Sequence, residues 1–184
     1  MIIGLTGPNA SGKGEAGLYI KSKGYGYISL SDILREEAAR SNIEPIRENL
    51  IRLGNDLRRK KGASFLALLA IEKLDDSKNY IIDSIRNPAE VEELKELKKF
   101  ILIGVDAATE TRFKRSLRRK RPGDAETLEE FIKKEEKENK TGAENQQLKK
   151  CLSMADTIII NDSTIEKLKG KIDEAIKENN PQKA

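Results

Sequence analysis

The sequence predicts an α/β fold in which a parallel β-sheet is covered by helices on both faces. Three observations indicate this class: short apolar segments alternate with helical ones, the first apolar segment ends in a glycine-rich turn, and a helix follows that turn. Fully apolar strands are typical of parallel sheets, because both of their faces are buried. With 184 residues, the chain is long enough for one domain and short for two.

The N-terminal segments follow this alternation. Residues 1–5 are apolar and end at turn residues in positions 6–8, which predicts a buried strand. A helix is expected from Gly12 to a stop near Gly24, and residues 25–30 are the second strand candidate. Strand, turn and helix thus follow one another without a gap.

Helices are expected throughout the next fifty residues. Ser31 and Asp32 offer an N-cap for a helix over residues 33–40. Between residues 42 and 76 leucines recur at helical spacing, and Gly62 divides this stretch into two helices. The second and third strands are therefore expected to be separated by helices only.

The rest of the chain continues the alternation. The remaining strand candidates are residues 80–82, 100–105 and 157–160. Helical patterns cover residues 91–94, 111–121, 128–139 and 165–177. The polar residues 179–184 are expected to be a flexible tail, so a single domain is expected over residues 1–178.

Composition excludes several classes of function. The 35 basic and 31 acidic residues leave a net charge of only +4, which argues against a protein that coats nucleic acid. The absence of histidine excludes Ser-His-Asp triads, and the single cysteine, Cys151, is expected to be a buried small residue. No signal peptide is visible and no apolar run approaches the roughly 18 residues that span a bilayer. A cytoplasmic protein without membrane contact is expected.

One sequence motif indicates a phosphate-binding site. Residues 7–13 read Gly-Pro-Asn-Ala-Ser-Gly-Lys and satisfy the pattern G-x-x-x-x-G-K between a predicted strand and a predicted helix. Glycines let the backbone curl so that its N–H groups and the helix N-terminus face a polyphosphate, and Lys13 reaches the outer phosphates. The predicted nucleotide-binding residues are Gly7, Asn9, Ala10, Ser11, Gly12, Lys13, Gly14 and Glu15.

The residues after this motif point to a family. Gly14 stands where the usual pattern has a serine or threonine for magnesium, and the same Lys-Gly ending occurs in adenylate kinases. Residues 28–35 (ISLSDILR) and 80–86 (YIIDSIR) are similar to segments that follow the phosphate loop in these enzymes. The chain therefore resembles nucleoside monophosphate kinases.

Two segments narrow the resemblance. Residues 83–92 and 155–162 are similar to the kinase-like domain ahead of some deoxycytidylate deaminases, and to archaeal proteins related to adenylate and dephospho-CoA kinases. The resemblance runs from Ile2 to about Ile176 and includes no deaminase. It implies a P-loop fold of three α/β/α layers whose five-stranded parallel sheet has the order 2-3-1-4-5. It also implies helical insertions, for acceptor binding over about residues 32–75 and for a lid over about residues 112–143.

The resemblance implies roles for single residues. Arg35 and Arg86 would bind the phosphate of the acceptor, with Ser31 and Asp32 beside Arg35. Asp83, expected at the end of its strand, would hold Mg²⁺ through bound water, since no hydroxyl follows the lysine of the loop. The positions of Arg35, Asp83 and Arg86, at or after the ends of predicted strands, agree with these roles. Ligands of parallel sheets bind at the carboxyl ends of the strands.

The basic segment over residues 111–121 supplies further arginines. Helical spacing places Arg112, Arg115 and Arg119 on one face, where they could close over the phosphates as a lid. An ordinary solvated basic face is the alternative. The expected catalytic residues, which neutralise charge on the transferred group, are Lys13, Arg86, Arg115 and Arg119. The residues expected to lie in the core or sheet rather than to stack on a base are Tyr19, Tyr25, Tyr27 and Tyr80.

Together these features predict a phosphotransferase that uses ATP and Mg²⁺ to phosphorylate a nucleoside or deoxynucleoside monophosphate, with small nucleotides as its partners. Dephospho-CoA is the alternative acceptor. A nucleotide-binding sensor without turnover, or an ATPase that acts on RNA or a partner protein, belongs to another class. The sequence leaves open the identity of the acceptor and the choice between monomer and homodimer.

Overall fold

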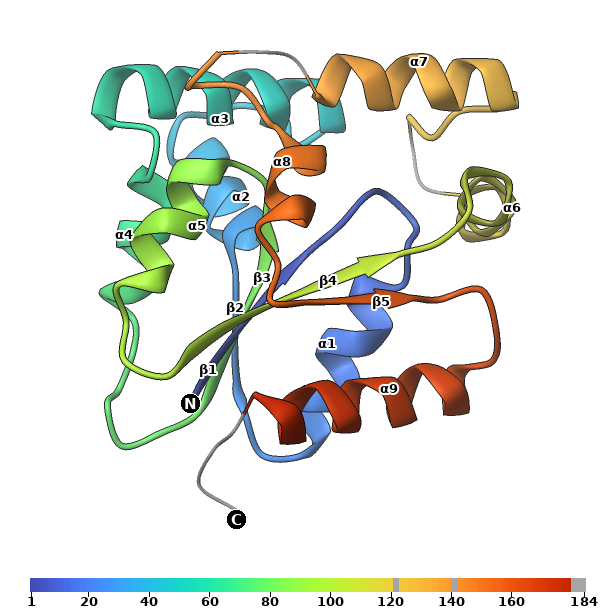
Figure 1. The fold of residues 1–184 in the computed structure, drawn as a ribbon. Helices are drawn as coiled ribbons and strands as arrows, with labels where there is room; N and C mark the ends of the chain where they lie inside the picture. Colours follow the sequence, from blue (N-terminus) through green and yellow to red (C-terminus); the bar gives the residue numbers. More distant parts are fainter. Residues whose placement is uncertain (121–122, 140–141, 180–184) are drawn as a thin grey trace.

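A computed structural model describes residues 1–120, 123–139 and 142–179 and shows a parallel sheet of five strands (Figure 1). The strands are β1 Ile2–Thr6, β2 Gly26–Ser29, β3 Tyr80–Ile85, β4 Phe100–Asp106 and β5 Thr157–Ile160. Their order across the sheet is β2-β3-β1-β4-β5, and every neighbouring pair is parallel. The predicted α/β/α class and the predicted strand order are confirmed.

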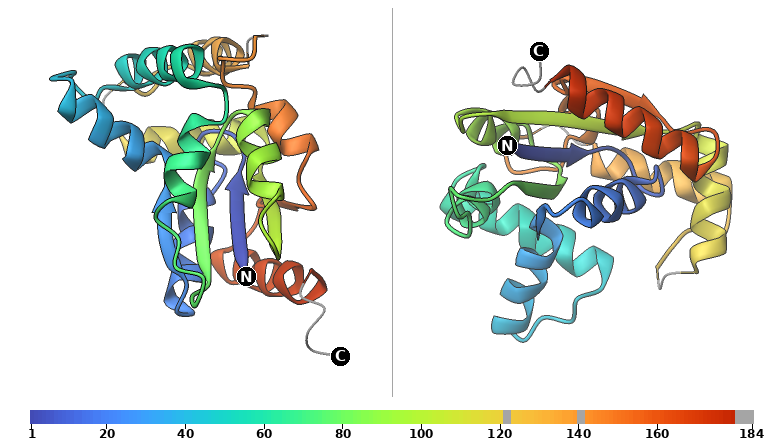
Figure 2. Two further views of the ribbon diagram at one scale, coloured as in Figure 1. Left: turned by 90° about the vertical axis from the view of Figure 1, so that its left-hand side faces the viewer. Right: turned by 90° about the horizontal axis from the view of Figure 1, so that it is seen from below.

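Helices cover both faces of the sheet (Figure 2). One face carries α1 (Lys13–Ser22) and α9 (Ile165–Glu178). The other carries α2 (Leu30–Arg40), α4 (Phe65–Ile71), α5 (Pro88–Lys95) and α8 (Leu148–Ser153). Beyond the carboxyl ends of the strands lie α3 (Arg47–Lys61), α6 (Thr109–Arg119) and α7 (Leu128–Glu138) (Figure 1).

Each helical layer encloses an apolar core against the sheet. Successive side chains of a strand point to opposite faces, so Ile81 packs in the core under α1 and α9 while Ile82 packs in the core under α2, α4 and α5. Cys151 of α8 is fully buried in the second core, as predicted. Burial raises the pKa of its thiol to about 12, so this thiol stays protonated and chemically inert.

The start of the helix after the second strand differs from prediction. Helix α2 begins at Leu30, because the hydroxyl of Ser29 accepts a hydrogen bond from the backbone N–H of Asp32 at 3.3 Å. Ser29 is therefore the N-cap, and the prediction of Ser31 and Asp32 as the cap is wrong. Both of these residues lie in the first turn of the helix instead.

Strand β3 and helix α8 also differ from prediction. β3 continues to Ile85, so Asp83 lies inside the strand and not at its end. The register between β1 and β3 shifts at this point and Ser84 has a φ of 66°, which marks a bulge directly after Asp83. Helix α8 was not predicted, because its six residues are too few to show a helical period.

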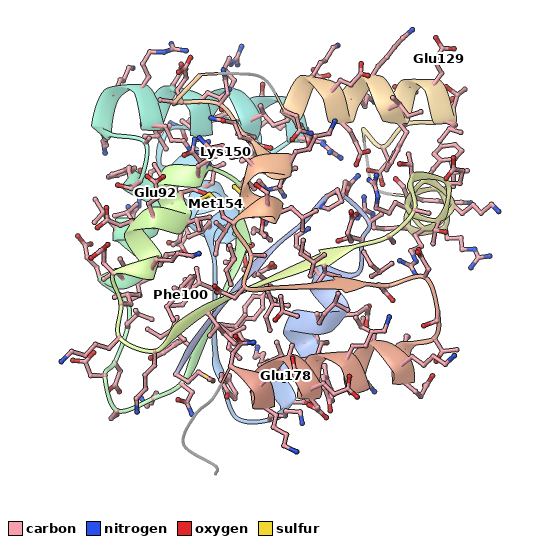
Figure 3. The ribbon with its side chains drawn as sticks, in the orientation of Figure 1. Glu92, Phe100, Glu129, Lys150, Met154 and Glu178 are labelled. Carbon is pink, nitrogen blue, oxygen red and sulfur yellow. The ribbon has the colours of Figure 1, made fainter. Side chains whose placement is uncertain are left out.

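Charged side chains cover the outer surfaces of the helices. Glu129 on α7 and Glu178 on α9, for example, project away from the sheet (Figure 3). None of the described helices is long and apolar enough to cross a membrane. Asn179 caps α9, with its amide donating to the carbonyl of Ala175 at 2.8 Å. The rest of the predicted tail, residues 180–184, lies outside the described residues.

Candidate functional site

The turn after β1 curls at the carboxyl end of the sheet and leads into α1. Gly7 and Gly12 have φ values of 138° and 106°, a conformation that side chains with a Cβ rarely adopt. A Cβ on Gly7 would lie 2.0 Å from the carbonyl oxygen of Val105, so the loop packs directly on β4. Gly12 is the N-cap of α1, which leaves the first N–H groups of this helix at the mouth of the turn.

A cavity of about 530 Å³, called the loop cavity below, opens over this turn. Its lining includes every predicted site residue except Gly7: Asn9, Ala10, Ser11, Gly12, Lys13, Gly14, Glu15, Ser31, Asp32, Arg35, Asp83, Arg86, Arg115 and Arg119. Gly7 lies beneath the loop against β4. Side chains from four separate parts of the sequence therefore meet around a single space.

Lys13 lies in the depth of the loop cavity. Its Nζ donates to the carbonyl oxygen of Pro8 at 3.2 Å, across the turn. Burial lowers the pKa of this ammonium from 10.5 to about 8; the charge of Arg86 adds to the effect and the carboxylate of Asp83 opposes it. A buried cation next to a second cation favours the binding of an anion at this place.

Asp83 faces the same cavity from β3 and is held at both oxygens. Oδ2 accepts from the hydroxyl of Tyr27 at 2.7 Å, and Oδ1 accepts from the backbone N–H of Ser84 at 2.6 Å. Burial, followed by the charge of Asp83, raises the pKa of the Tyr27 hydroxyl, which therefore remains a donor. The ring of Tyr27 packs against the core as predicted, but its hydroxyl reaches the candidate site, which the sequence did not indicate.

Asp83 fits a magnesium ion that is bound mainly by other ligands. Among the described residues no group of three or more histidine, cysteine, aspartate or glutamate side chains is arranged to hold a metal. Mg²⁺ usually keeps several waters and takes one or two carboxylates together with nucleotide phosphates. A single ordered carboxylate beside a phosphate loop meets this requirement, whereas the described residues do not form a site made only of protein ligands.

Helix α6 turns its predicted arginine face to the loop. Arg115 donates to the carbonyl oxygens of Ser11 at 3.3 Å and Asn161 at 2.8 Å. The side chain of Asn161 in turn donates to the Ser11 carbonyl at 2.8 Å. Asn161 follows β5 and also lines the loop cavity. Sequence reasoning missed its role, because a single asparagine after a strand carries no pattern of its own.

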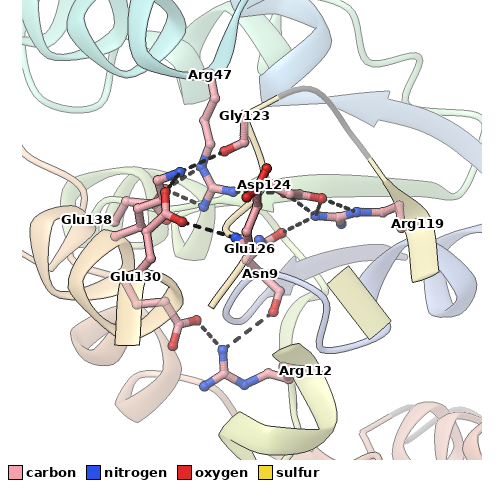
Figure 4. Close-up of polar contacts among 11 residues, drawn as sticks. Asn9, Arg47, Arg112, Arg119, Gly123, Asp124, Glu126, Glu130 and Glu138 are labelled. Atoms are coloured by element: carbon pink, nitrogen blue, oxygen red, sulfur yellow. Dashed lines mark hydrogen bonds and ion pairs between the residues drawn. The ribbon is translucent and has the colours of Figure 1, made fainter. Parts of the chain in front are cut away.

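Arg112 and Arg119 approach the loop at Asn9. Arg119 donates to the side-chain oxygen of Asn9 and pairs with Asp124, both at 3.0 Å. Arg112 donates to the backbone oxygen of Asn9 at 3.5 Å (Figure 4). It also pairs with Glu135 of α7. The predicted common face of these arginines is thus directed at the phosphate loop rather than at solvent. Residue 121, at the end of the same basic segment, lies outside the described residues.

A second set of ion pairs connects α6 and α7 to α3. Arg47, at the start of α3, donates through Nε to Glu138 of α7 at 2.8 Å and lies 3.7 Å from Asp124 (Figure 4). Asp124 also binds Arg119, so it joins the two arginines. Neither Arg47 nor Glu138 was predicted, because their positions in the sequence are 91 residues apart.

A second cavity of about 370 Å³, called the arginine cavity below, adjoins the first. Five arginines line it: Arg35, Arg47, Arg58, Arg86 and Arg119. Its apolar walls come from Leu30, Leu34, Ile46, Leu50, Ile51 and Leu66. The residues common to both cavities are Asn9, Ser31, Arg35, Ser84, Arg86 and Arg119. The two spaces therefore meet between the phosphate loop and α2.

Arg86 lies at this junction, and none of the described residues pairs with its guanidinium. Its backbone N–H donates to Glu90 at 3.0 Å and its carbonyl accepts from the N–H of Gln147 at 2.8 Å, so the residue is fixed through its main chain. Its side chain makes no hydrogen bond or ion pair with any described residue, and burial lowers the pKa of the guanidinium. Arg35, in contrast, is half exposed and pairs with Asp32 at 2.5 Å.

Comparison with known proteins places the chain in a family. Residues 6–133 match the family model described as an AAA domain. The chain is 35% identical over 176 residues to a UPF0200 protein of Sulfurisphaera tokodaii, with 96% of each chain covered. It is 34% identical over 173 residues to a UPF0200 protein of Hyperthermus butylicus, covering 93% of this chain and 90% of the relative.

Solved structures show the same fold at low identity. TT1252 from Thermus thermophilus has a TM-score of 0.63 at 19% identity, with 97% of both chains covered. A shikimate kinase from Acinetobacter baumannii has a TM-score of 0.61 at 14% identity, covering 98% of this chain and 95% of the kinase. A gluconokinase from Sinorhizobium meliloti has a TM-score of 0.60 at 12% identity, covering 96% of this chain and 91% of the gluconokinase. With its phosphate loop and parallel sheet, the chain belongs to the AAA domain family of P-loop NTPases and to the UPF0200 proteins.

Proposed function

We propose that the protein is an ATP-dependent phosphotransferase whose acceptor is a nucleoside or deoxynucleoside monophosphate. The observation that carries this proposal is the junction of the two cavities at Arg86 and Arg119. A phosphotransferase must hold a nucleotide and a second anion end to end, so that the transferred group lies between them. Here a phosphate loop lines one cavity and arginines line the next, and three guanidinium groups, those of Arg35, Arg86 and Arg119, belong to both.

The loop cavity supports the donor side of the reaction. The N–H groups at the start of α1 and the ammonium of Lys13 suit the β- and γ-phosphates of ATP. Arg115 and Arg119 of α6 close the same space from the other side. Mg²⁺, when bound, would neutralise phosphate charge, and Asp83 is the residue that would hold it through water.

The arginine cavity supports an acceptor that is itself an anion. Its five arginines outnumber the two acidic residues in its lining, Glu44 and Asp124. Arg86 has no counter-charge in direct contact among the described residues, so an incoming phosphate would supply one. Arg35 and Arg47 lie around the same space and would bind the remaining phosphate oxygens.

The reaction fits a site without histidine. An oxygen of the acceptor phosphate attacks the γ-phosphorus of ATP, while the bond from that phosphorus to the β–γ bridging oxygen breaks and its electron pair leaves with ADP. A phosphate dianion has no proton to lose, so no general base is needed. Arg86 and Arg119 line both cavities and would neutralise the negative charge that spreads over the transferred group. The kinases that share this fold support the reaction class.

The proposal assigns the inserted helices as well. Residues of about 32–75 would bind the acceptor, residues of about 112–143 would form the lid, and both would belong to one domain over residues 1–178. The ion pairs from Arg47 to Glu138 and Asp124 support this assignment, because they join the two insertions across the site.

A panel assay tests the proposal. The protein is incubated with ATP and Mg²⁺ and with ribo- and deoxyribonucleoside monophosphates or dephospho-CoA, and the products are identified by mass. The proposal expects a gain of one phosphoryl group on a monophosphate and an equal yield of ADP. Phosphorylation of dephospho-CoA alone would favour a ribose hydroxyl as the acceptor. Nucleotide binding without transfer to any acceptor would favour a sensor, and hydrolysis independent of acceptor would favour an ATPase.

A further inference from the structure

The inner end of the arginine cavity differs from its mouth. Near the loop its lining is cationic, but between α2, α3 and α4 it is apolar, with side chains such as Leu34, Leu50 and Leu66. Two buried polar side chains, Arg58 and Gln146, belong to this lining. Neither was predicted as a site residue, and a phosphate bound at Arg86 does not account for them.

Arg58 is fixed by a buried ion pair and retains one unmet donor. Its Nε and Nη2 donate to Oε1 of Glu90 at 2.9 and 2.7 Å, and its side chain is only 3% exposed. Nη1 is buried and makes no hydrogen bond with any described residue. Buried polar groups are almost always bonded in folded proteins, so this N–H group points to a missing acceptor atom.

Gln146 supplies the complementary group. The residue is 5% exposed, and its Oε1 is buried without a hydrogen-bond partner in the described part of the chain. Its position is fixed on both sides: the amide of Asn87 donates to the carbonyl of Asn145 at 2.8 Å, and the N–H of Gln147 donates to the carbonyl of Arg86. One residue with an unmet donor and one residue with an unmet acceptor thus line the same apolar pocket.

Both groups are tied to the peptide that carries Arg86. Glu90 binds Arg58 with one oxygen, and with the other it accepts the N–H groups of Arg86 and Asn87, each at 3.0 Å. Gln147, next to Gln146, holds the carbonyl of Arg86 at 2.8 Å. The unmet donor of Arg58 and the unmet acceptor of Gln146 therefore have fixed positions relative to the proposed phosphate site at Arg86.

We propose that the inner end of the arginine cavity is a nucleobase site in which Arg58 and Gln146 read the edge of the base. This inference rests on the proposed function and narrows its acceptor. Apolar walls suit the two faces of a planar ring, and the N–H of Arg58 with the carbonyl of Gln146 complements a ring nitrogen beside an exocyclic amine. Adenine and cytosine present that edge. A sugar phosphate without a base would leave both polar groups without a hydrogen-bond partner.

Binding measurements on the intact protein test the base site. Calorimetry compares adenosine, cytidine, guanosine and uridine 5′-monophosphates with ribose 5-phosphate, which has the phosphate and sugar but no base. We expect the adenine and cytosine nucleotides to bind most tightly. Gln146→Leu should weaken their binding about tenfold, because Arg58 then has to meet the base alone, while the affinity for ribose 5-phosphate stays within about twofold. Gln147→Leu, whose side chain lies outside both cavities, is the matched control and should bind as the wild type does.

Three results would overturn the base site: equal binding of ribose 5-phosphate and the nucleotides by the wild type, an equal loss for both in Gln146→Leu, or tighter binding of the guanine and uracil nucleotides. The mass assay separates this failure from a failure of the proposed reaction. Equal phosphorylation of nucleotides and ribose 5-phosphate would remove the base site and leave the phosphotransferase. Base-dependent binding without any phosphorylation would leave the base site and remove the reaction.

Discussion

The loop cavity and the arginine cavity are two ways of building an anion site. In the loop cavity the phosphate is expected to bind at the loop itself, one continuous stretch over residues 9–15, whose backbone N–H groups are fixed dipoles without a titrating charge. The arginine cavity is made of side chains that come mainly from α2, α3, α4, α6 and the end of β3. Four of its arginines need acidic partners to hold them: Asp32 for Arg35, Glu138 for Arg47, Glu90 for Arg58 and Asp124 for Arg119.

The two cavities are therefore sensitive to different kinds of substitution. A backbone site tolerates little change of shape, because its glycines occupy conformations that other residues avoid. A side-chain site depends instead on the balance between its cations and acids. Arg86 is the exception within the arginine cavity, since its guanidinium has no partner among the described residues.

Replacing Lys13 with alanine should have the largest effect. We expect kcat to fall by about a thousandfold, because the ammonium is the only side-chain cation that the loop itself supplies. The fold should remain intact, since burial of the charged lysine opposes folding and nothing in the core depends on it. Steady-state rates and thermal unfolding measure the two quantities, with the exposed Lys114→Ala as the control. Loss of cooperative unfolding in Lys13→Ala would assign the lysine a structural role instead.

Arg86→Ala should come next, with a loss of about a hundredfold in kcat/KM for the acceptor. Its guanidinium has no ion pair with any described residue, so the change would remove a contact to the substrates and leave none of the described acids unpaired. Arg118→Ala is the matched control, because Arg118 lies on the exposed face of α6 and lines neither cavity. We expect that control to change the rate by less than about twofold. Equal losses in both variants would mean that only the general basic charge matters.

The loop cavity could be predicted from the sequence and the arginine cavity only in part. The phosphate loop is local: its glycines and its lysine lie within seven residues, and their spacing determines the curl. The strand order followed from the resemblance that the same motif introduced. Arg35 and Arg86 were found because each lies in a short segment that can be compared with a family.

The remaining residues were missed because they meet only in the folded chain. Arg58 reaches Glu90 over 32 residues and Arg47 reaches Glu138 over 91, and no periodic pattern relates such positions. One local signal was present: Asn87 and Glu90 are three residues apart and form a capping box at the start of α5. That pattern predicts a helix start, but it does not show that Glu90 also binds a buried arginine.

A smaller effect, about tenfold on nucleotide affinity, is expected for Gly12→Ala. The φ of 106° disfavours alanine, and the added Cβ would lie 2.2 Å from the side-chain nitrogen of Asn161, which would have to move. Gly14→Ala is the control, because a Cβ at Gly14 meets no atom within 4 Å. Calorimetric titration with ATP compares the variants. If both alanine substitutions weaken ATP binding equally, the positive φ of Gly12 does not explain the loss of affinity.

The smallest expected effect is a pH dependence of ATP affinity that the affinity for the acceptor does not share. Because the pKa of Lys13 is lowered to about 8, the unbound protein loses this charge above that pH, and ATP affinity should fall about fivefold between pH 7 and pH 9. Arginines do not titrate in this range, so the affinity of the acceptor should stay constant. Stability should move in the opposite direction: the unfolded lysine binds a proton up to pH 10.5, so between about pH 8 and 10.5 the free energy of unfolding rises with pH. Lys13→Met should flatten both curves. A pH-dependent ATP affinity that persists in this variant would have to come from a group other than the lysine of the loop.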